Sequence, residues 1–251
     1  MTLNLILFAL FGLIIGSFIN VLVLRTDDLA SVLTGRSECP NCKTKLVWYD
    51  LIPVLSFFIL KTRCRYCNKP ISWQYPVVEL STGAVFVLLY YFFGLNVATF
   101  YYAAIFSILM VAVIHDIKTE EVPEIFIWIA LGLSVFGFLA GGFDVWQMLL
   151  GGLIGGGFLG AIVTVSKGKW MGSGDIKIGI IMGFLLGSGV ILLGLLMAFV
   201  LGSVIGLIMM GLKRKSMQDS VPFAPFLVLA IFISLLVGNY IVGLYLGYTM
   251  F

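Results

Sequence analysis

The chain has 251 residues, of which 61% are hydrophobic and only 11% are charged. Soluble globular proteins are about half apolar and a quarter charged, so this chain has too few polar groups to cover its apolar surface in water. The composition excludes an ordinary soluble domain and predicts a protein of the lipid bilayer. The net charge of +3 matters less than the places where the charges lie.

Apolar runs of roughly 18 residues or more are candidates for membrane-spanning helices. We find eight, of which the sixth is short and borders the seventh near Gly187-Ser188-Gly189. The first has neither a basic leader nor a small-residue cleavage site, so we expect a retained helix and not a signal peptide. The sequence thus predicts an all-α polytopic membrane protein with about eight transmembrane helices. The predicted spans are 3–24, 77–94, 97–115, 123–141, 144–166, 176–188, 189–212 and 226–247.

The orientation of the spans follows from Lys and Arg, which collect in cytoplasmic loops. If the N-terminus lies outside, every basic residue falls in or beside an inside loop. Asp116 and Asp175, at the borders of two spans, then lie at the same cytoplasmic face. The long loop after the first span lies in a reducing compartment. The predicted inside segments are 25–76, 116–122, 167–175 and 213–225.

The long loop contains two C-x-x-C pairs, Cys39 with Cys42 and Cys64 with Cys67, separated by 21 residues. This spacing is typical of four-thiolate zinc sites, in which each pair supplies two ligands from one tight turn. Two disulfides or a redox pair are the alternatives. A cytosolic location argues against stable disulfides, and no thioredoxin-like βαβ pattern surrounds either pair. We therefore favour a structural zinc ion with four thiolate ligands and no open catalytic position.

Two aspartates stand out because charged groups at membrane depth are costly and suggest function. Asp116 ends the third span, and a short polar link leads from it to a proline that opens the next. Asp175 follows Gly172 and Gly174, and glycine lets one backbone turn tightly and another approach closely. The alternative is that Asp175 caps a helix and that each aspartate is a solvated residue at a helix end.

A pair of carboxylates can hydrolyse a peptide bond without a metal. One, ionised, takes a proton from water, while the other, protonated, polarises the scissile carbonyl. Such a pair shares a proton because two like charges a few ångströms apart do not both ionise readily. Between the aspartates, the fifth span carries six glycines that predict close helix packing. These are Gly151, Gly152, Gly155, Gly156, Gly157 and Gly160.

In combination, these motifs resemble the type IV prepilin peptidases, which are bifunctional leader peptidases and N-methyltransferases of the GxGD membrane aspartyl protease class. The resemblance runs along nearly the whole chain, and the loop Trp48-Tyr49-Asp50 resembles the Gram-positive competence-pilus branch. The chain departs from many members at Glu124, where they have Asp, and at Ala224, where they have Gly. The matching segments are Gly16–Val21, Ile52–Ser56, Tyr75–Gly83, Val122–Pro123, Gly172–Lys177 and Val221–Phe226.

The resemblance implies cleavage of prepilins or pseudopilins at the cytoplasmic face of the inner (cytoplasmic) membrane, with Asp116 and Asp175 as the catalytic pair. Gly172, Gly174 and Lys177 would belong to the active-site loop. It also implies methylation of the new N-terminal amine with S-adenosylmethionine, and Glu79 matches the family's glutamate linked to that step. We expect membrane lipid but no nucleic acid as a partner. The expected domains are a first helix (1–24), a zinc-binding and methyltransferase-like region (25–95) and a transmembrane aspartyl peptidase core (96–251).

Alternative functions are a peptidase without methyl transfer, a transporter that uses intramembrane carboxylates, and a membrane-anchored zinc module. No internal repeat supports a transporter, and a zinc module leaves the glycine-rich loop unexplained. Several acids could attract a basic leader, although a solvated surface position is the alternative for each. They are Asp27, Asp28, Glu38, Asp50, Glu120 and Glu121.

Overall fold

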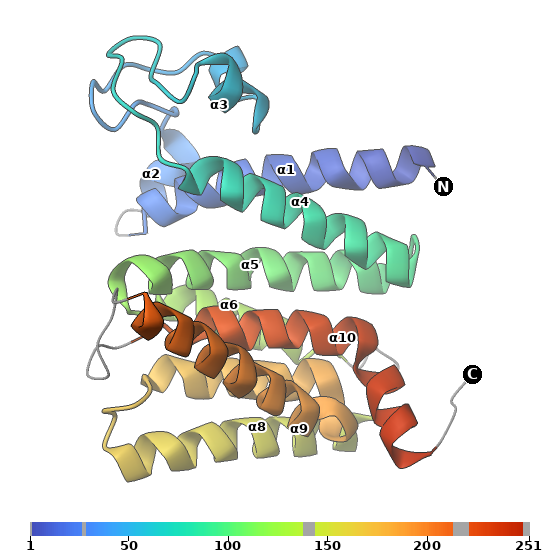
Figure 1. Cartoon of the computed structure of the whole chain (residues 1–251). Coiled ribbons are helices and arrows are strands. Elements are labelled where there is room, and N and C mark those ends of the chain that lie inside the picture. Colours follow the sequence, from blue (N-terminus) through green and yellow to red (C-terminus); the bar gives the residue numbers. More distant parts are fainter. Residues whose placement is uncertain (1, 27–28, 138–143, 213–220, 248–251) are drawn as a thin grey trace. The chain divides into compact units, whose positions relative to one another are not determined.

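The computed structural model describes residues 2–26, 29–137, 144–212 and 221–247 (Figure 1). Within these ranges the secondary structure consists of α-helices, one short 3-10 helix and two isolated β-bridges. The predicted all-α class is therefore confirmed. The chain divides into two compact units, Met1–Val111 and Ala112–Phe251, and each is described by itself.

The first unit is built on α1 (Thr2–Leu24) and α4 (Gln74–Phe93), which pack side by side (Figure 1). Glycine allows the close approach, because a Cβ at Gly16 would lie 2.7 Å from the Cα of Glu79. The four cysteines lie in the loop between these helices. The same connection also contains three short helices, which are α2 (Leu29–Thr34), η1 (Trp48–Leu51) and α3 (Leu55–Ile59).

The second unit begins within α5 (Val97–Thr119) and is centred on the packing of α8 against α9. Glycines on the two helices face each other. A Cβ at Gly151 would collide with the carbonyl of Gly183, and a Cβ at Gly155 would collide with that of Gly179. The six-glycine segment therefore packs closely against another helix, as the spacing predicts. The helices of this unit are α6 (Glu124–Ser134), α8 (Val145–Ser166), α9 (Ser173–Gly211) and α10 (Ala224–Leu246).

Helix α9 is broken at Gly187, whose φ of 66° and ψ of 174° are not helical. In a straight helix Gly194 would lie about 18 Å along the axis from Met182. Instead, a Cβ at Gly194 would meet the side chains of Met182 and Leu186. The two halves of α9 therefore fold back on each other (Figure 1). The break falls at the predicted border near Gly187-Ser188-Gly189.

Six described helices are long and apolar enough to cross a bilayer, so the chain is a multi-pass membrane protein. The predicted count of eight is not confirmed. The predicted spans 176–188 and 189–212 correspond to the two halves of α9, which counts once among the six. The predicted span 123–141 contains the 11-residue α6, and its last four residues lie outside the described ranges. Eleven helical residues extend only about 16 Å, roughly half of the hydrocarbon core. The six helices are α1, α4, α5, α8, α9 and α10.

Replacement of Gly155 by valine should destabilise the second unit, because the new side chain would collide with the backbone of Gly179. Overpacking of this kind lowers the free energy of unfolding by about 1–3 kcal/mol. Unfolding in detergent micelles measures the loss. Gly157→Val is the matched control, since a Cβ at Gly157 meets no atom within 4 Å. Equal stability of the two variants would contradict the packing described.

Candidate functional site

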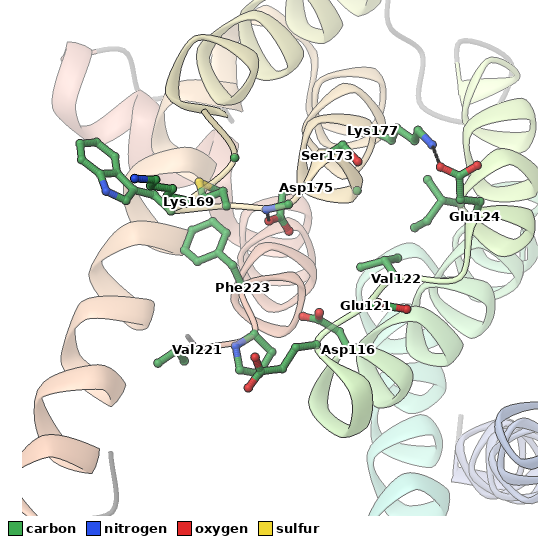
Figure 2. Close-up of a pocket in the computed structure, with 18 residues that line it drawn as sticks. Asp116, Glu121, Val122, Glu124, Lys169, Ser173, Asp175, Lys177, Val221 and Phe223 are labelled. Atoms are coloured by element: carbon green, nitrogen blue, oxygen red, sulfur yellow. Dashed lines mark hydrogen bonds and ion pairs between the residues drawn. The ribbon is translucent and has the colours of Figure 1, made fainter. Parts of the chain in front are cut away.

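Asp116 and Asp175 line the same cavity, which has a volume of about 480 Å³ and lies within the second unit (Figure 2). Asp116 is near the end of α5, and Asp175 is in the first turn of α9. Both are buried, with 5% and 6% of their surface exposed. The charge of Asp116 acts on the Asp175 carboxyl. The structure thus brings together two carboxyl groups that are 59 positions apart in the sequence (175 − 116).

Backbone amides at two helix starts hold the carboxyl groups in place. The N–H of Ala224, the first residue of α10, donates to Oδ2 of Asp116 at 3.1 Å. The N–H of Gly172 donates to Oδ2 of Asp175 at 3.2 Å. Helix N-termini carry unpaired N–H groups and partial positive charge, which suit them to accept carboxylates. Each aspartate therefore has one oxygen fixed by the backbone.

Gly174 allows the start of α9 to lie against the segment that follows Asp116. A Cβ at Gly174 would lie 3.1 Å from Cβ of Val122, tighter than ordinary side-chain contact. At Gly172 the nearest atom to such a Cβ is 3.9 Å away, so a side chain would have more room there. Both glycines line the cavity. Of the two, Gly174 is the one that brings the two aspartate-bearing segments close together.

Lys177 also lines the cavity, and it joins α9 to α6. Its Nζ lies 2.7 Å from Oε1 of Glu124 and 4.9 Å from the ring centroid of Trp128 (Figure 2). The Glu124 side chain is 71% exposed, so this ion pair contributes less than a buried one would. The ion pair joins α9, which contains Asp175 in its first turn, to α6, which follows the loop after Asp116.

Among the predicted acidic candidates, Glu120 and Glu121 line the cavity and are exposed. Two others have local basic partners. Asp50 accepts a hydrogen bond from Arg65 Nε at 2.9 Å, and Glu38 lies 3.3 Å from Lys43 Nζ. Asp27 and Asp28 lie outside the described residues.

The sequence did not single out Lys169 and Phe223 individually, yet both line the cavity. Lys169 belongs to a predicted inside loop. Phe223 lies within the proline-containing segment that resembles the prepilin peptidases. The predicted inside loop and the proline-containing segment suggested a cytoplasmic position for both residues. Neither pattern could predict that their side chains line the cavity.

The four cysteines of the first unit form a cluster that can hold a metal ion. Their sulfur atoms all lie within 4.8 Å of one another, and those of Cys39 and Cys67 are 3.9 Å apart. Four thiolates around zinc, with bonds of about 2.3 Å, lie about 3.8 Å apart. All four thiols are free. Hydrogen bonds from the Thr44 side chain and backbone lower the pKa of the Cys42 thiol to about 6, whereas burial and the neighbouring cysteines raise the pKa of the Cys67 thiol to about 11.

The two cysteine turns have the same backbone pattern. In each, the N–H of the first cysteine (Cys39 or Cys64) donates to the carbonyl five residues later, at 3.0 and 2.9 Å. The residue after the second cysteine, Lys43 or Asn68, donates back to the carbonyl of the first cysteine, at 2.8 and 2.9 Å. Both of these residues have a φ of 57°. The repeated geometry aims two thiols from each turn at one point.

Glu79 lies in the first unit, on α4, and is buried. Its Oε2 accepts the N–H of Val54 at 2.7 Å. The predicted methyltransferase residue is therefore in contact with the loop that carries the cysteines.

A polytopic helical protein with two buried aspartates on one cavity and a four-cysteine loop has the parts of a membrane aspartyl peptidase. Comparison with known families agrees with this class. The profile described as Type IV leader peptidase family matches residues 103–207, and that of the Bacterial Peptidase A24 N-terminal domain matches residues 10–93. The chain belongs to the type IV leader peptidase family.

Several relatives carry the name prepilin leader peptidase/N-methyltransferase. The Bacillus subtilis protein is 31% identical over 94% of this chain and 96% of its own length. The Legionella pneumophila protein is 26% identical over 96% of this chain and 94% of its own length. The Myxococcus xanthus protein is 38% identical over 54% of this chain and 39% of its own length. No solved structure matches the chain significantly.

Elemental analysis of the purified chain should find one metal ion per molecule, since the four thiols converge on one point. Replacement of Cys39 or Cys64 by serine should remove most of that metal, because a structural site needs all four ligands. Asn41→Ser, an exposed position within the first turn, is the matched control. Full metal content in the cysteine variants would rule out this cluster as the site.

Proposed function

We propose that this protein removes the basic leader from prepilins or pseudopilins at the cytoplasmic face of the cytoplasmic membrane. We further propose that it methylates the new N-terminal amine. The observation that carries the first proposal is the cavity lined by two buried aspartates, Asp116 and Asp175. The names of the relatives support both activities.

In the proposed mechanism, Asp116 and Asp175 act as one unit. Two nearby like charges repel, so the pair holds one proton between its two carboxyl groups. The ionised member takes a proton from water as the water oxygen attacks the scissile carbonyl carbon. The protonated member donates a hydrogen bond to the carbonyl oxygen and stabilises the charge that develops there. A proton then passes to the leaving nitrogen as the peptide bond breaks.

The leader would approach the pair along the loop that follows Asp116. Glu120 and Glu121 line the cavity there, and their charges complement a basic leader. His115 helps to hold this loop, because its Nδ1 lies 2.8 Å from the carbonyl oxygen of Glu121. A substrate helix could remain in the bilayer while its leader reaches the cavity.

Zinc is the metal that we propose for Cys39, Cys42, Cys64 and Cys67. Four thiolates fill a tetrahedral coordination sphere, so the ion would hold the loop together and take no part in cleavage. This matches the donor set of the cluster, which consists of sulfur alone.

For methyl transfer we propose S-adenosylmethionine as the donor and residues 25–95 as the region responsible. The described residues contain no strand followed by a glycine-rich turn and helix, so they lack the nucleotide cradle of soluble methyltransferases. We therefore derive no step through the donor. We assign 1–24 to a first helix and 96–251 to the peptidase core, with the N-terminus outside. Membership of the leader peptidase family does not favour a transporter.

Asp116→Asn and Asp175→Asn should each reduce prepilin cleavage by at least about 10²-fold, the usual scale for loss of a general acid or base. Each change keeps the side-chain volume and removes only the proton chemistry. Mass spectrometry of the pilin N-terminus measures the cut. Asp144→Asn is the matched control, because Asp144 is an exposed residue before α8. Cleavage at the wild-type rate by either variant would refute the mechanism.

Glu121→Gln should raise the KM for a prepilin with a basic leader and leave kcat nearly unchanged. Glu121 is exposed, and removal of its charge weakens attraction to the leader, by about two- to threefold in KM at low salt. Glu120 is left unchanged in this variant because its charge acts on the Asp116 carboxyl. Steady-state cleavage measures the effect. A prepilin whose leader lysines are replaced by glutamine is the control and should not respond. An equal rise in KM for both substrates would exclude the electrostatic role.

A further inference from the structure

A strained turn lies in the first unit, between the two cysteine pairs. Val54 has a φ of 61° and a ψ of −49°, and the N–H of Leu55 donates to the carbonyl of Pro53 at 2.5 Å. This is the rare γ-turn with positive φ at its centre. Positive φ is a genuine outlier for a β-branched residue such as valine. A backbone outlier of this kind persists only when surrounding contacts impose it, and such outliers cluster at functional sites.

Glu79 contacts the turn directly. Its Oε2 accepts the N–H of Val54, the strained residue itself, at 2.7 Å. Hydrogen bonds to a carboxylate are shorter and stronger than those between neutral groups. Glu79 is itself held in place, because it is buried on α4. Gly16 lets α1 pack directly on the backbone of Glu79, where a Cβ would have no room.

The turn sets the course of the chain into α3. Leu55 is the first residue of α3, directly after the turn. Within α3, Phe57 is buried and its ring centroid lies 4.9 Å from that of Trp73, the residue just before α4. Phe58 remains exposed beside it, with ring centroids 6.5 Å apart for Phe58 and Trp73. Loss of the Glu79 contact would therefore shift an aromatic surface near the cytoplasmic end of α4.

We propose that Glu79 serves methyl transfer as a positioning residue, which holds the Pro53–Leu55 turn and does not itself contact the methyl donor or the amine. This inference rests on the proposed methyltransferase activity. When bound, the donor would supply the methyl group that the amine nitrogen accepts, with a neutral thioether and a proton released to water as the other products. The role of Glu79 in this scheme is to accept one backbone hydrogen bond, and no step draws on its negative charge.

Two substitutions distinguish a positioning role of Glu79 from direct contact with the methyl donor or the amine. Glu79→Ala should reduce methyl transfer by about tenfold or more, because it leaves a buried N–H without its acceptor. Glu79→Gln should retain most of the activity, because its amide oxygen can still accept the Val54 N–H. Both are measured on the full-length protein in membranes with a prepilin substrate, and mass spectrometry reports the methyl group and the cut on the same peptide.

A second-site substitution gives a stronger test. Val54→Gly should restore methyl transfer to Glu79→Ala, because glycine adopts positive φ without help from the carboxylate. Val47→Gly is the matched control and should not restore it, since Val47 has an ordinary extended backbone (φ −91°, ψ 161°). If Glu79→Gln is as inactive as Glu79→Ala and Val54→Gly gives no rescue, then Glu79 acts through its charge and the proposal is wrong.

Hydrogen exchange of residues 52–60 decides the question even if the wild-type protein cuts prepilins without methylating them, an outcome that would remove the methyltransferase proposal alone. Exchange in this segment should rise in Glu79→Ala and remain near the wild-type level in Glu79→Gln. Unchanged exchange in Glu79→Ala would show that the carboxylate does not hold the turn.

Discussion

The second unit is organised by the burial of two carboxyl groups on one cavity. Such burial is unfavourable, because it removes charge from water and brings like charges together. The structure offsets this cost with backbone N–H groups at two helix starts, from Ala224 to Asp116 and from Gly172 to Asp175. Gly174 also contributes, since a Cβ there would lie 3.1 Å from Cβ of Val122 and crowd the contact between the two segments. Unfavourable burial also underlies the chemistry proposed for the pair, because it favours a state in which only one of the two groups is ionised.

Glycine packing gives this arrangement a rigid support. In lipid, helices are not driven together by water exclusion, so close van der Waals contact takes over. Facing glycines join α8 to the first half of α9, and the break at Gly187 lets the second half return alongside the first. Asp175 therefore sits at the start of a helix that is held from two sides. The first unit uses the same device, with Gly12 and Gly16 of α1 against α4.

Much of the site could be predicted from local patterns, although its partners could not. The distribution of Lys and Arg predicted one face for Asp116 and Asp175, which line one cavity, and the cysteine spacing predicted a cluster that the fold assembles. The contacts of Asp116 with Ala224 and of Glu79 with Val54 join positions 108 and 25 residues apart, and no periodicity encodes them. The count of eight spans is not confirmed, because hydropathy registers apolar residues and not the backbone. It predicted the border at the break in α9 but could not register that α6 ends after eleven residues.

The central claim is that Asp116 and Asp175 act as one proton-sharing pair. Residues that act as a unit are not additive, because the loss of either removes the function of both. The most direct measurement is the residual cleavage rate of Asp116→Asn/Asp175→Asn compared with each single variant. If the two aspartates act as one pair, the double variant should cleave no more slowly than the slower single variant. A double variant slowed by the product of the two single effects would show two independent roles and would contradict the claim.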